Sequence, residues 1–112
     1  MNLYVVRHGD ALSDLADPAR PLSPGGREEL DKLANCLVSH LQASVILHSG
    51  KTRAQESAQI LQAVALPNAS VQMRPGLSPN DPVDQMAEEL QHAAQDLVIV
   101  GHLPYVLSLI HI

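Results

Sequence analysis

Apolar residues in this chain gather in short runs, and amphipathic stretches separate these runs from one another. Residues 2–6 (NLYVV) and residues 43–47 (ASVIL) predict two strands, each followed closely by polar and glycine residues. Residues 69–73 (ASVQM) predict a third, weaker strand. Residues 96–100 (DLVIV) are continuously apolar after the aspartate, which is typical of a strand buried on both faces of a parallel sheet.

Between these runs, apolar residues recur with helical spacing. Ser23 as N-cap and Pro24 at the first helical position predict the start of a first helix. Its apolar face is expected to consist of Leu30, Leu33, Leu37 and Leu41. A second helix is predicted over residues 51–64, with a narrow face made of Ala54, Ala58, Leu61 and Ala65. Residues 84–94 predict a third, mostly solvated helix, and residues 101–110 predict a turn that enters a fourth.

Strands that alternate with helices predict an α/β fold: a three-layer sandwich with a mostly parallel central sheet and helices on both faces. A length of 112 residues suits a single domain over residues 1–112. The chain ends in an apolar segment, YVLSLIHI, without a polar cap. We therefore expect the domain to be incomplete, with its C-terminal part missing.

Composition and charge exclude several classes of function. The formal net charge of −5 argues against a nucleic-acid or membrane-surface protein, because such proteins normally carry a basic excess. No apolar run is long enough to cross a bilayer, and the first residues lack the pattern of a signal peptide. The single cysteine, Cys36, excludes an internal disulfide. A cytoplasmic protein is expected.

Basic side chains and glycines follow three of the predicted strands. The first strand is followed by Arg7, His8 and Gly9, the second by a segment ending at Arg53, and the last by Gly101 and His102. The carboxyl ends of parallel strands meet at one edge of a sheet, where ligands bind. Each glycine allows the backbone to approach a ligand closely. The sequence therefore predicts a phosphate-sized pocket built from two arginines and two histidines.

Arg53 adds a separate argument for an anion. It falls in the first turn of the predicted second helix, where the helix dipole disfavours a cation. A bound anion would turn this position into a site, because it would contact both the free N–H groups and the guanidinium.

Each of these features also has a common structural explanation. An arginine and histidine at a strand end usually lie on the surface, and a Gly-His pair can form a simple helix entry. Lys51 and Arg53 alone would normally belong to a solvated helix face. The remaining histidines are interpreted as non-functional: His40, His48, His92 and His111. The joint placement after successive strands is what favours a site.

Four blocks of this sequence resemble the histidine phosphatase, or phosphoglycerate mutase-like, superfamily. They are VVRHGDA, RPLSPGG, HSGKTRAQESA and VIVGHLP, and together they span the chain to about Tyr105. The branch most similar to this pattern is that of the short, single-domain SixA-type phosphohistidine phosphatases. Relatives generally continue beyond the last block, which adds to the expectation of a missing C-terminal part.

The resemblance implies a role for each matching residue. His8 would be the nucleophile that becomes transiently phosphorylated, Arg7 and Arg53 would hold the phosphoryl oxygens, and His102 would complete the pocket. Arg20 would either reach the site or hold its own loop in place. Asp81 is the one carboxylate available as a general acid in the loop before the third helix. Neither a cofactor nor a metal ion is expected.

The function implied is hydrolysis of phosphohistidine in a partner protein. The absence of a long insertion before DLVIV favours an open pocket that admits a protein-bound phosphoryl group, and it disfavours a mutase, which needs a lid. Two alternatives remain open at this stage. One is a phosphatase of small phosphomonoesters that uses the same site, and the other is a non-catalytic phosphate-binding or interaction module.

Overall fold

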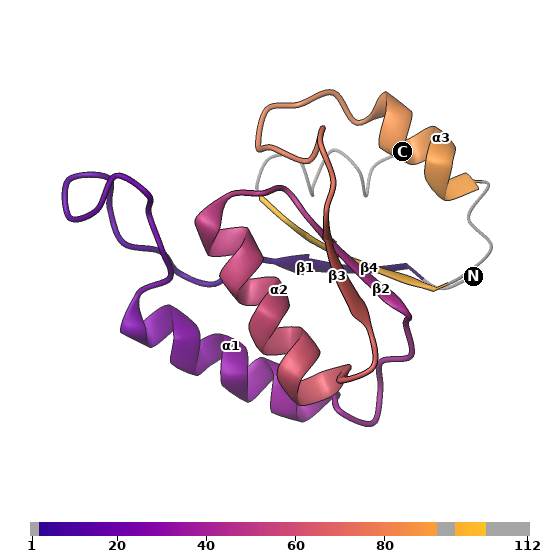
Figure 1. The fold of residues 1–112 in the computed structure, drawn as a ribbon, viewed down its shortest axis with the longest axis horizontal. Helices are drawn as coiled ribbons and strands as arrows, with labels where there is room; N and C mark the ends of the chain where they lie inside the picture. The colour runs from indigo at the N-terminus through magenta and orange to yellow at the C-terminus, as the bar shows by residue number, and fades with distance from the viewer. Residues whose placement is uncertain (1–2, 92–95, 103–112) are drawn as a thin grey trace.

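The computed structural model of this protein describes residues 3–91 and 96–102 (Figure 1). All of its strand pairs are parallel, and the strands lie in the order β1-β4-β2-β3. The strands are β1 (Leu3–Arg7), β2 (Val45–His48), β3 (Ser70–Met73) and β4 (Leu97–Gly101). The helices are α1 (Pro24–Leu37), α2 (Thr52–Ala65) and α3 (Asp84–Gln91). The predicted parallel α/β fold is confirmed.

Helices cover both faces of the sheet. Alternate residues of β4 point in opposite directions, so Val98 and Val100 pack in the larger apolar cluster with α2, whereas Ile99 packs with Leu77 and Met86 near α3. Figure 1 shows α1 and α2 together on one side of the sheet and α3 on the other. All three of these β4 side chains are fully buried, as the continuous apolar run predicts.

The first helix begins as predicted, but one leucine of its predicted apolar face is not buried. The Ser23 hydroxyl accepts a hydrogen bond from the Gly26 N–H at 2.9 Å, and Pro24 occupies the first turn. The buried residues of α1 are Gly26, Leu30 and Ala34, which are spaced four apart. Leu33 lies beside this face and is 42% exposed, so its predicted place in the core is wrong.

Three strands, β1, β2 and β4, extend one residue beyond the end of the apolar runs that predict them. Arg7 pairs with Gly101 and His48 pairs with Val100, so both basic residues belong to the sheet. Backbone pairing does not depend on the polarity of a side chain, which explains why the apolar pattern ends too early. The predicted fourth helix lies largely outside the described residues, and none of the described helices is long and apolar enough to span a membrane.

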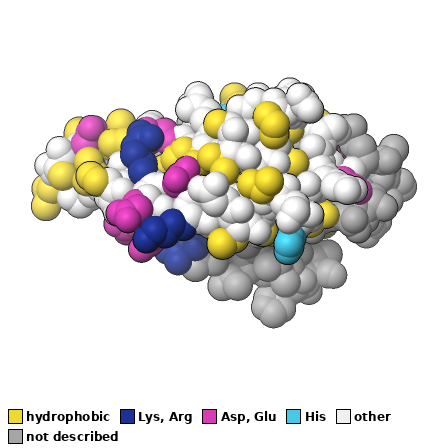
Figure 2. Space-filling model, turned by 90° about the horizontal axis from the view of Figure 1, so that it is seen from below, with side chains coloured by type: hydrophobic (Ala, Val, Ile, Leu, Met, Phe, Trp, Pro, Cys, Tyr) yellow, Lys and Arg dark blue, Asp and Glu magenta, His cyan; other side chains and the backbone are white. Residues whose placement is uncertain are grey.

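The surface over α1 and α2 carries charges of both signs. Figure 2 shows basic and acidic side chains next to each other toward one end of this face. One such pair joins Arg27 of α1 to Glu56 of α2. The other oxygen of the Glu56 carboxylate accepts from the Leu22 N–H at 2.8 Å, so this glutamate ties the loop before α1 to α2.

The loop after β1 packs against the start of α1 at a pair of glycines. A Cβ on Gly9 would lie 2.9 Å from the Gly26 carbonyl oxygen, and a Cβ on Gly26 would lie 2.1 Å from the Asp10 carbonyl oxygen. Neither distance is compatible with a side chain unless the backbone moves. Glycine at these positions thus allows α1 to hold residues 8–10 in place.

This contact predicts opposite effects for two neighbouring glycines of α1. Gly26→Ala should destabilise the protein by roughly 1–3 kcal/mol through overpacking, and it should lower any activity that depends on residues 8–10. Gly25→Ala is the matched control, because its Cβ would have no closer neighbour than the Ser23 hydroxyl at 3.9 Å. This substitution should be neutral or stabilise the helix by up to about 1 kcal/mol. Urea unfolding of both variants measures the difference, and equal stabilities would contradict the packing described.

Candidate active site

The ends of β1 and β4 bring two histidines together. The His8 N–H donates to the Gly101 carbonyl at 3.1 Å, which continues the pairing of the two strands. The imidazole rings of His8 and His102 then lie with their centroids 4.8 Å apart and their planes at 55°. The predicted convergence of these strand ends is therefore present in the structure.

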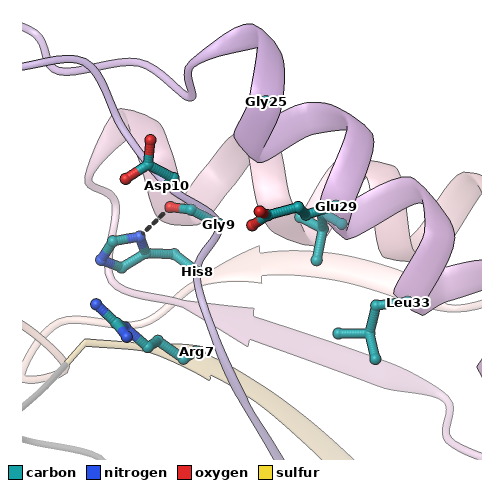
Figure 3. Close-up of a pocket in the computed structure, with 8 residues that line it drawn as sticks. Arg7, His8, Gly9, Asp10, Gly25, Glu29 and Leu33 are labelled. Atoms are coloured by element: carbon teal, nitrogen blue, oxygen red, sulfur yellow. Dashed lines mark hydrogen bonds between the residues drawn. The ribbon is translucent and has the colours of Figure 1, made fainter.

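A hydrogen bond to the backbone fixes the tautomer of His8. Its Nδ1 lies 2.6 Å from the Gly9 carbonyl oxygen, and this contact is drawn as the dashed line in Figure 3. A carbonyl oxygen can only accept, so Nδ1 carries the proton. The lone pair of neutral His8 is consequently on Nε2.

The segment after His8 is also anchored to α2. The Gly9 N–H donates to the Ser57 hydroxyl at 3.0 Å, and this hydroxyl donates to the Arg53 carbonyl at 2.7 Å. Ser57 is completely buried. The Gly9 N–H is thus bonded within the protein, and α1 fills the space beside the Gly9 Cα. Contacts within the protein therefore account for both the orientation of this N–H and the need for glycine at this position. Ser57 was not predicted, although it lies one helical turn after Arg53.

Burial and three arginines lower the pKa of His8. Burial has the largest effect, and the positive charges of Arg53, Arg7 and Arg20 act in the same direction. The hydrogen bond to the Gly9 carbonyl acts in the opposite direction by favouring the charged ring. The net lowering keeps His8 neutral at neutral pH, which is the form that has a lone pair to share.

Arg53 occupies the predicted position at the start of α2. It is the second residue of the helix, and the N-cap residue Lys51 makes no side-chain capping hydrogen bond. Burial and the nearby charge of Arg20 lower the pKa of Arg53. Among the described residues, the Arg53 guanidinium has no hydrogen bond or ion pair. Free N–H groups and an unpaired guanidinium at one helix start favour an anion.

Arg20 holds its own loop in place, which is one of the two roles considered for it. Its Nε donates to the Leu12 carbonyl at 3.1 Å, which holds the loop between β1 and α1. Its φ of 49° places the backbone in the left-handed region. The charge of Arg20 also lowers the pKa of His8, Arg53 and His102, so its guanidinium lies within electrostatic reach of the site.

His102 lies beside His8 and is 1% exposed. Its Nε2 is 2.5 Å from the hydroxyl oxygen of Ser49, the residue that directly follows β2. Burial, and then the charges of His8, Arg53, Lys51 and Arg20, lower the pKa of His102 to about 4. Ser49 thus contacts His102 directly, and exposed Lys51 adds a positive charge nearby.

The depressed pKa of His102 predicts a loss of stability in mild acid. In the unfolded chain this ring titrates near 6.5, and in the folded protein it titrates near 4. The unfolded state therefore binds more protons between these values, and the free energy of unfolding falls as the pH drops through this window. Urea unfolding at pH 7 and pH 4.5 should show a smaller fall for His102→Asn than for the wild type. An equal fall in both proteins would contradict the assignment.

His48 and Asp81 both make local structural contacts. Buried His48, interpreted as non-functional, accepts from the Gly50 N–H through Nδ1 at 3.1 Å. The Asp81 carboxylate, the candidate general acid, accepts from the Ser78 N–H at 2.9 Å in its own loop. The described residues contain no group of three histidine, cysteine or carboxylate side chains that could hold a metal ion.

A cavity of about 460 Å³ lies between the end of β1 and α1. It is lined by Arg7, His8, Gly9, Asp10, Gly25, Glu29, Leu30 and Leu33. In Figure 3 the His8 ring and the Arg7 guanidinium lie on one side of the chain at Gly9, and Glu29 and Leu33 of α1 lie on the other. The His8 ring therefore lies on the same side of the chain as the Arg7 guanidinium, and the Glu29 carboxylate lies on the opposite side.

Comparison with known proteins agrees with this geometry. Phosphohistidine phosphatase SixA of Escherichia coli (strain K12) is 30% identical to this chain over an alignment 113 residues long, gaps included. The alignment covers 95% of this chain and 70% of that protein. The structure of the protein histidine phosphatase SixA complexed with tungstate has a TM-score of 0.86 at 27% identity, over 98% of this chain and 74% of that one. A protein from Agrobacterium tumefaciens assigned as SixA shares the fold, with a TM-score of 0.82 at 20% identity over 97% of this chain and 73% of its own.

The family profile gives the broadest assignment. The profile described as histidine phosphatase superfamily (branch 1) matches residues 3–81, which include β1 with its Arg-His-Gly end and the start of α2. This match covers more than half of the chain, and it agrees with the SixA sequence and structure in the same region. The chain therefore belongs to the histidine phosphatase superfamily.

Proposed function

We propose that this chain is a phosphohistidine phosphatase that removes the phosphoryl group through a covalent intermediate on His8. The observation that carries the proposal is the state of His8, whose Nδ1 proton is held by the Gly9 carbonyl at 2.6 Å. This leaves the Nε2 lone pair free in a site to which Arg7, Arg20 and Arg53 bring positive charge. A neutral imidazole of fixed orientation is a suitable nucleophile for a phosphoryl group.

In the first step, His8 Nε2 attacks the phosphorus of the substrate and forms a P–N bond. The P–N bond to the substrate imidazole breaks, and the departing nitrogen keeps the electron pair. The negative charge on the three phosphoryl oxygens is stabilised by the guanidiniums of Arg7 and Arg53, with Arg20 nearby. Positioning and charge therefore supply the catalysis, without a step that requires a metal ion.

In the second step, water attacks the phosphorus and the P–N bond to His8 breaks. Inorganic phosphate leaves, and His8 returns to its neutral form. The substrate imidazole is a good leaving group once its other nitrogen is protonated, so the first step needs no strong general acid. The Asp81 carboxylate already accepts a hydrogen bond from Ser78, which agrees with a minor role for it in catalysis.

Similarity to SixA supports both the substrate class and the oxyanion site. The Escherichia coli relative is a phosphohistidine phosphatase, and a SixA structure contains tungstate, a tetrahedral oxyanion like phosphate. We therefore propose a phosphohistidine-bearing protein as the partner of this chain. Tungstate also provides a probe that measures binding at the site independently of turnover.

A comparison of three substrate classes tests this function. A phosphohistidine-bearing protein, p-nitrophenyl phosphate and a set of phosphorylated metabolites should be assayed side by side, with EDTA present throughout. We expect kcat/KM to be highest for the phosphohistidine protein. Higher values for a metabolite would replace the proposal with a small-molecule phosphatase. Tungstate binding without hydrolysis of any substrate would indicate a phosphate-binding module.

A further inference from the structure

Buried His102 has one nitrogen with a partner and one without. Its Nε2 lies 2.5 Å from the Ser49 hydroxyl oxygen. Its Nδ1 is buried and has no hydrogen-bond partner among the described residues. A buried polar nitrogen without a partner is unfavourable, so its retention beside the nucleophile points to a partner that arrives with the substrate.

The Ser49 hydroxyl is held in a defined place by the turn that follows β2. His48 pairs with Val100, so the residues just beyond these two lie side by side at the sheet edge. Gly50 adopts a φ of 90°, a conformation that favours glycine, and its N–H donates to His48 Nδ1 at 3.1 Å. These features fix the backbone on both sides of Ser49 and direct its hydroxyl toward His102.

The contacts of Ser49 favour one direction for its hydrogen bond to His102. The Lys51 N–H donates to the Ser49 oxygen at 3.3 Å, so this oxygen already acts as an acceptor. Its hydrogen is then available to the lone pair of His102 Nε2. A neutral imidazole that accepts at Nε2 carries its own proton on Nδ1, the nitrogen without a partner.

We propose that Ser49 is a positioning residue that holds His102 in its Nδ1-protonated neutral form, so that the buried Nδ1–H donates to an oxygen of the phosphoryl group at His8. The inference rests on the proposed function for the identity of the ligand. The ring centroids of His102 and His8 are 4.8 Å apart, which places His102 beside any group attached to His8. The low pKa of about 4 agrees with a ring that remains neutral while it donates.

The tautomer can be tested without any catalytic assay. Long-range 1H–15N NMR at pH 7 distinguishes a protonated from an unprotonated ring nitrogen, and His102→Asn assigns the signals among the six histidines of the chain. In the wild type we expect Nδ1 of His102 to be protonated and Nε2 to be unprotonated. A proton on Nε2 in the wild type would overturn the proposal, whether or not the protein is a phosphatase.

Variants of Ser49 test the consequence for binding. Ser49→Ala should shift His102 toward the other tautomer and weaken tungstate binding roughly tenfold, which corresponds to the loss of one hydrogen bond. Ser49→Thr keeps the hydroxyl and should restore most of the affinity and the original tautomer. Ser39→Ala is the matched control, because Ser39 contacts exposed His40 through its hydroxyl at 3.2 Å and lies outside the site.

Two outcomes of this series would overturn the proposal. One is a folded Ser49→Ala protein with the wild-type tautomer and unchanged tungstate affinity. The other is an equal loss of affinity in the alanine and threonine variants together with an unchanged tautomer, because it would assign Ser49 to the shape of the turn.

Discussion

Arg53→Ala is expected to lower kcat/KM for a phosphorylated substrate by roughly a hundred- to thousandfold. Arg53 is the second residue of α2, and its guanidinium has no partner among the described residues. Its interaction with the phosphoryl oxygens should strengthen in the transition state. Arg53→Lys should recover little activity, because a point charge does not reproduce the two parallel hydrogen bonds of a guanidinium.

The stability of the Arg53 variants separates catalysis from folding. A cation in the first turn opposes the helix dipole, so Arg53→Ala should leave the free energy of unfolding unchanged or slightly higher without ligand. Arg74→Ala removes the same charge from an ion pair with Glu89 and should leave kcat/KM unchanged. Normal turnover of an Arg53→Ala protein that is strongly destabilised would assign this arginine to the fold instead.

His8→Ala is expected to remove activity almost completely, by at least roughly a thousandfold. Tungstate affinity should change much less, because the positive charges of Arg7, Arg20 and Arg53 remain. This separation of binding from turnover distinguishes a nucleophile from a residue that only binds phosphate. His40→Ala removes an exposed histidine and serves as the control. Substantial hydrolysis by His8→Ala would contradict the role proposed for His8.

The placement of the two candidate histidines was predictable because topology determines where they lie. Parallel strands place their carboxyl ends at one edge of the sheet, so a residue that directly follows a strand has little freedom in its position. His8 follows β1, and His102 follows β4, which is the neighbour of β1 in the sheet. The hydrophobic pattern that locates the strands therefore also locates these two rings.

The residues that support the site could not be predicted in the same way. Ser57 binds the Gly9 N–H across 48 positions of sequence, and Ser49 meets His102 across 53. Serine is common on helices and in turns, and only the three-dimensional packing selects which hydroxyl meets a partner. Arg20 brings its positive charge near the two histidines from a long loop, whose path no periodic pattern describes.

Exposure along α1 shows a second limit of the hydrophobic pattern. Leu33 matches the helical spacing of its neighbours, yet the buried residues of α1 are Gly26, Leu30 and Ala34, and Gly26 makes a tight contact with Gly9. The contact depends on the absence of two side chains. A periodicity of large apolar residues cannot reveal it.

Trapping of the phosphorylated enzyme tests directly whether His8 is the nucleophile. The protein is mixed with a phosphohistidine-bearing substrate that carries labelled phosphate, and the reaction is quenched within a single turnover. We expect label on the enzyme that is labile in acid and stable in base, that maps to the peptide containing His8, and that is absent from His8→Ala. Label that survives acid, or that appears equally on the His8→Ala protein, would contradict this role of His8.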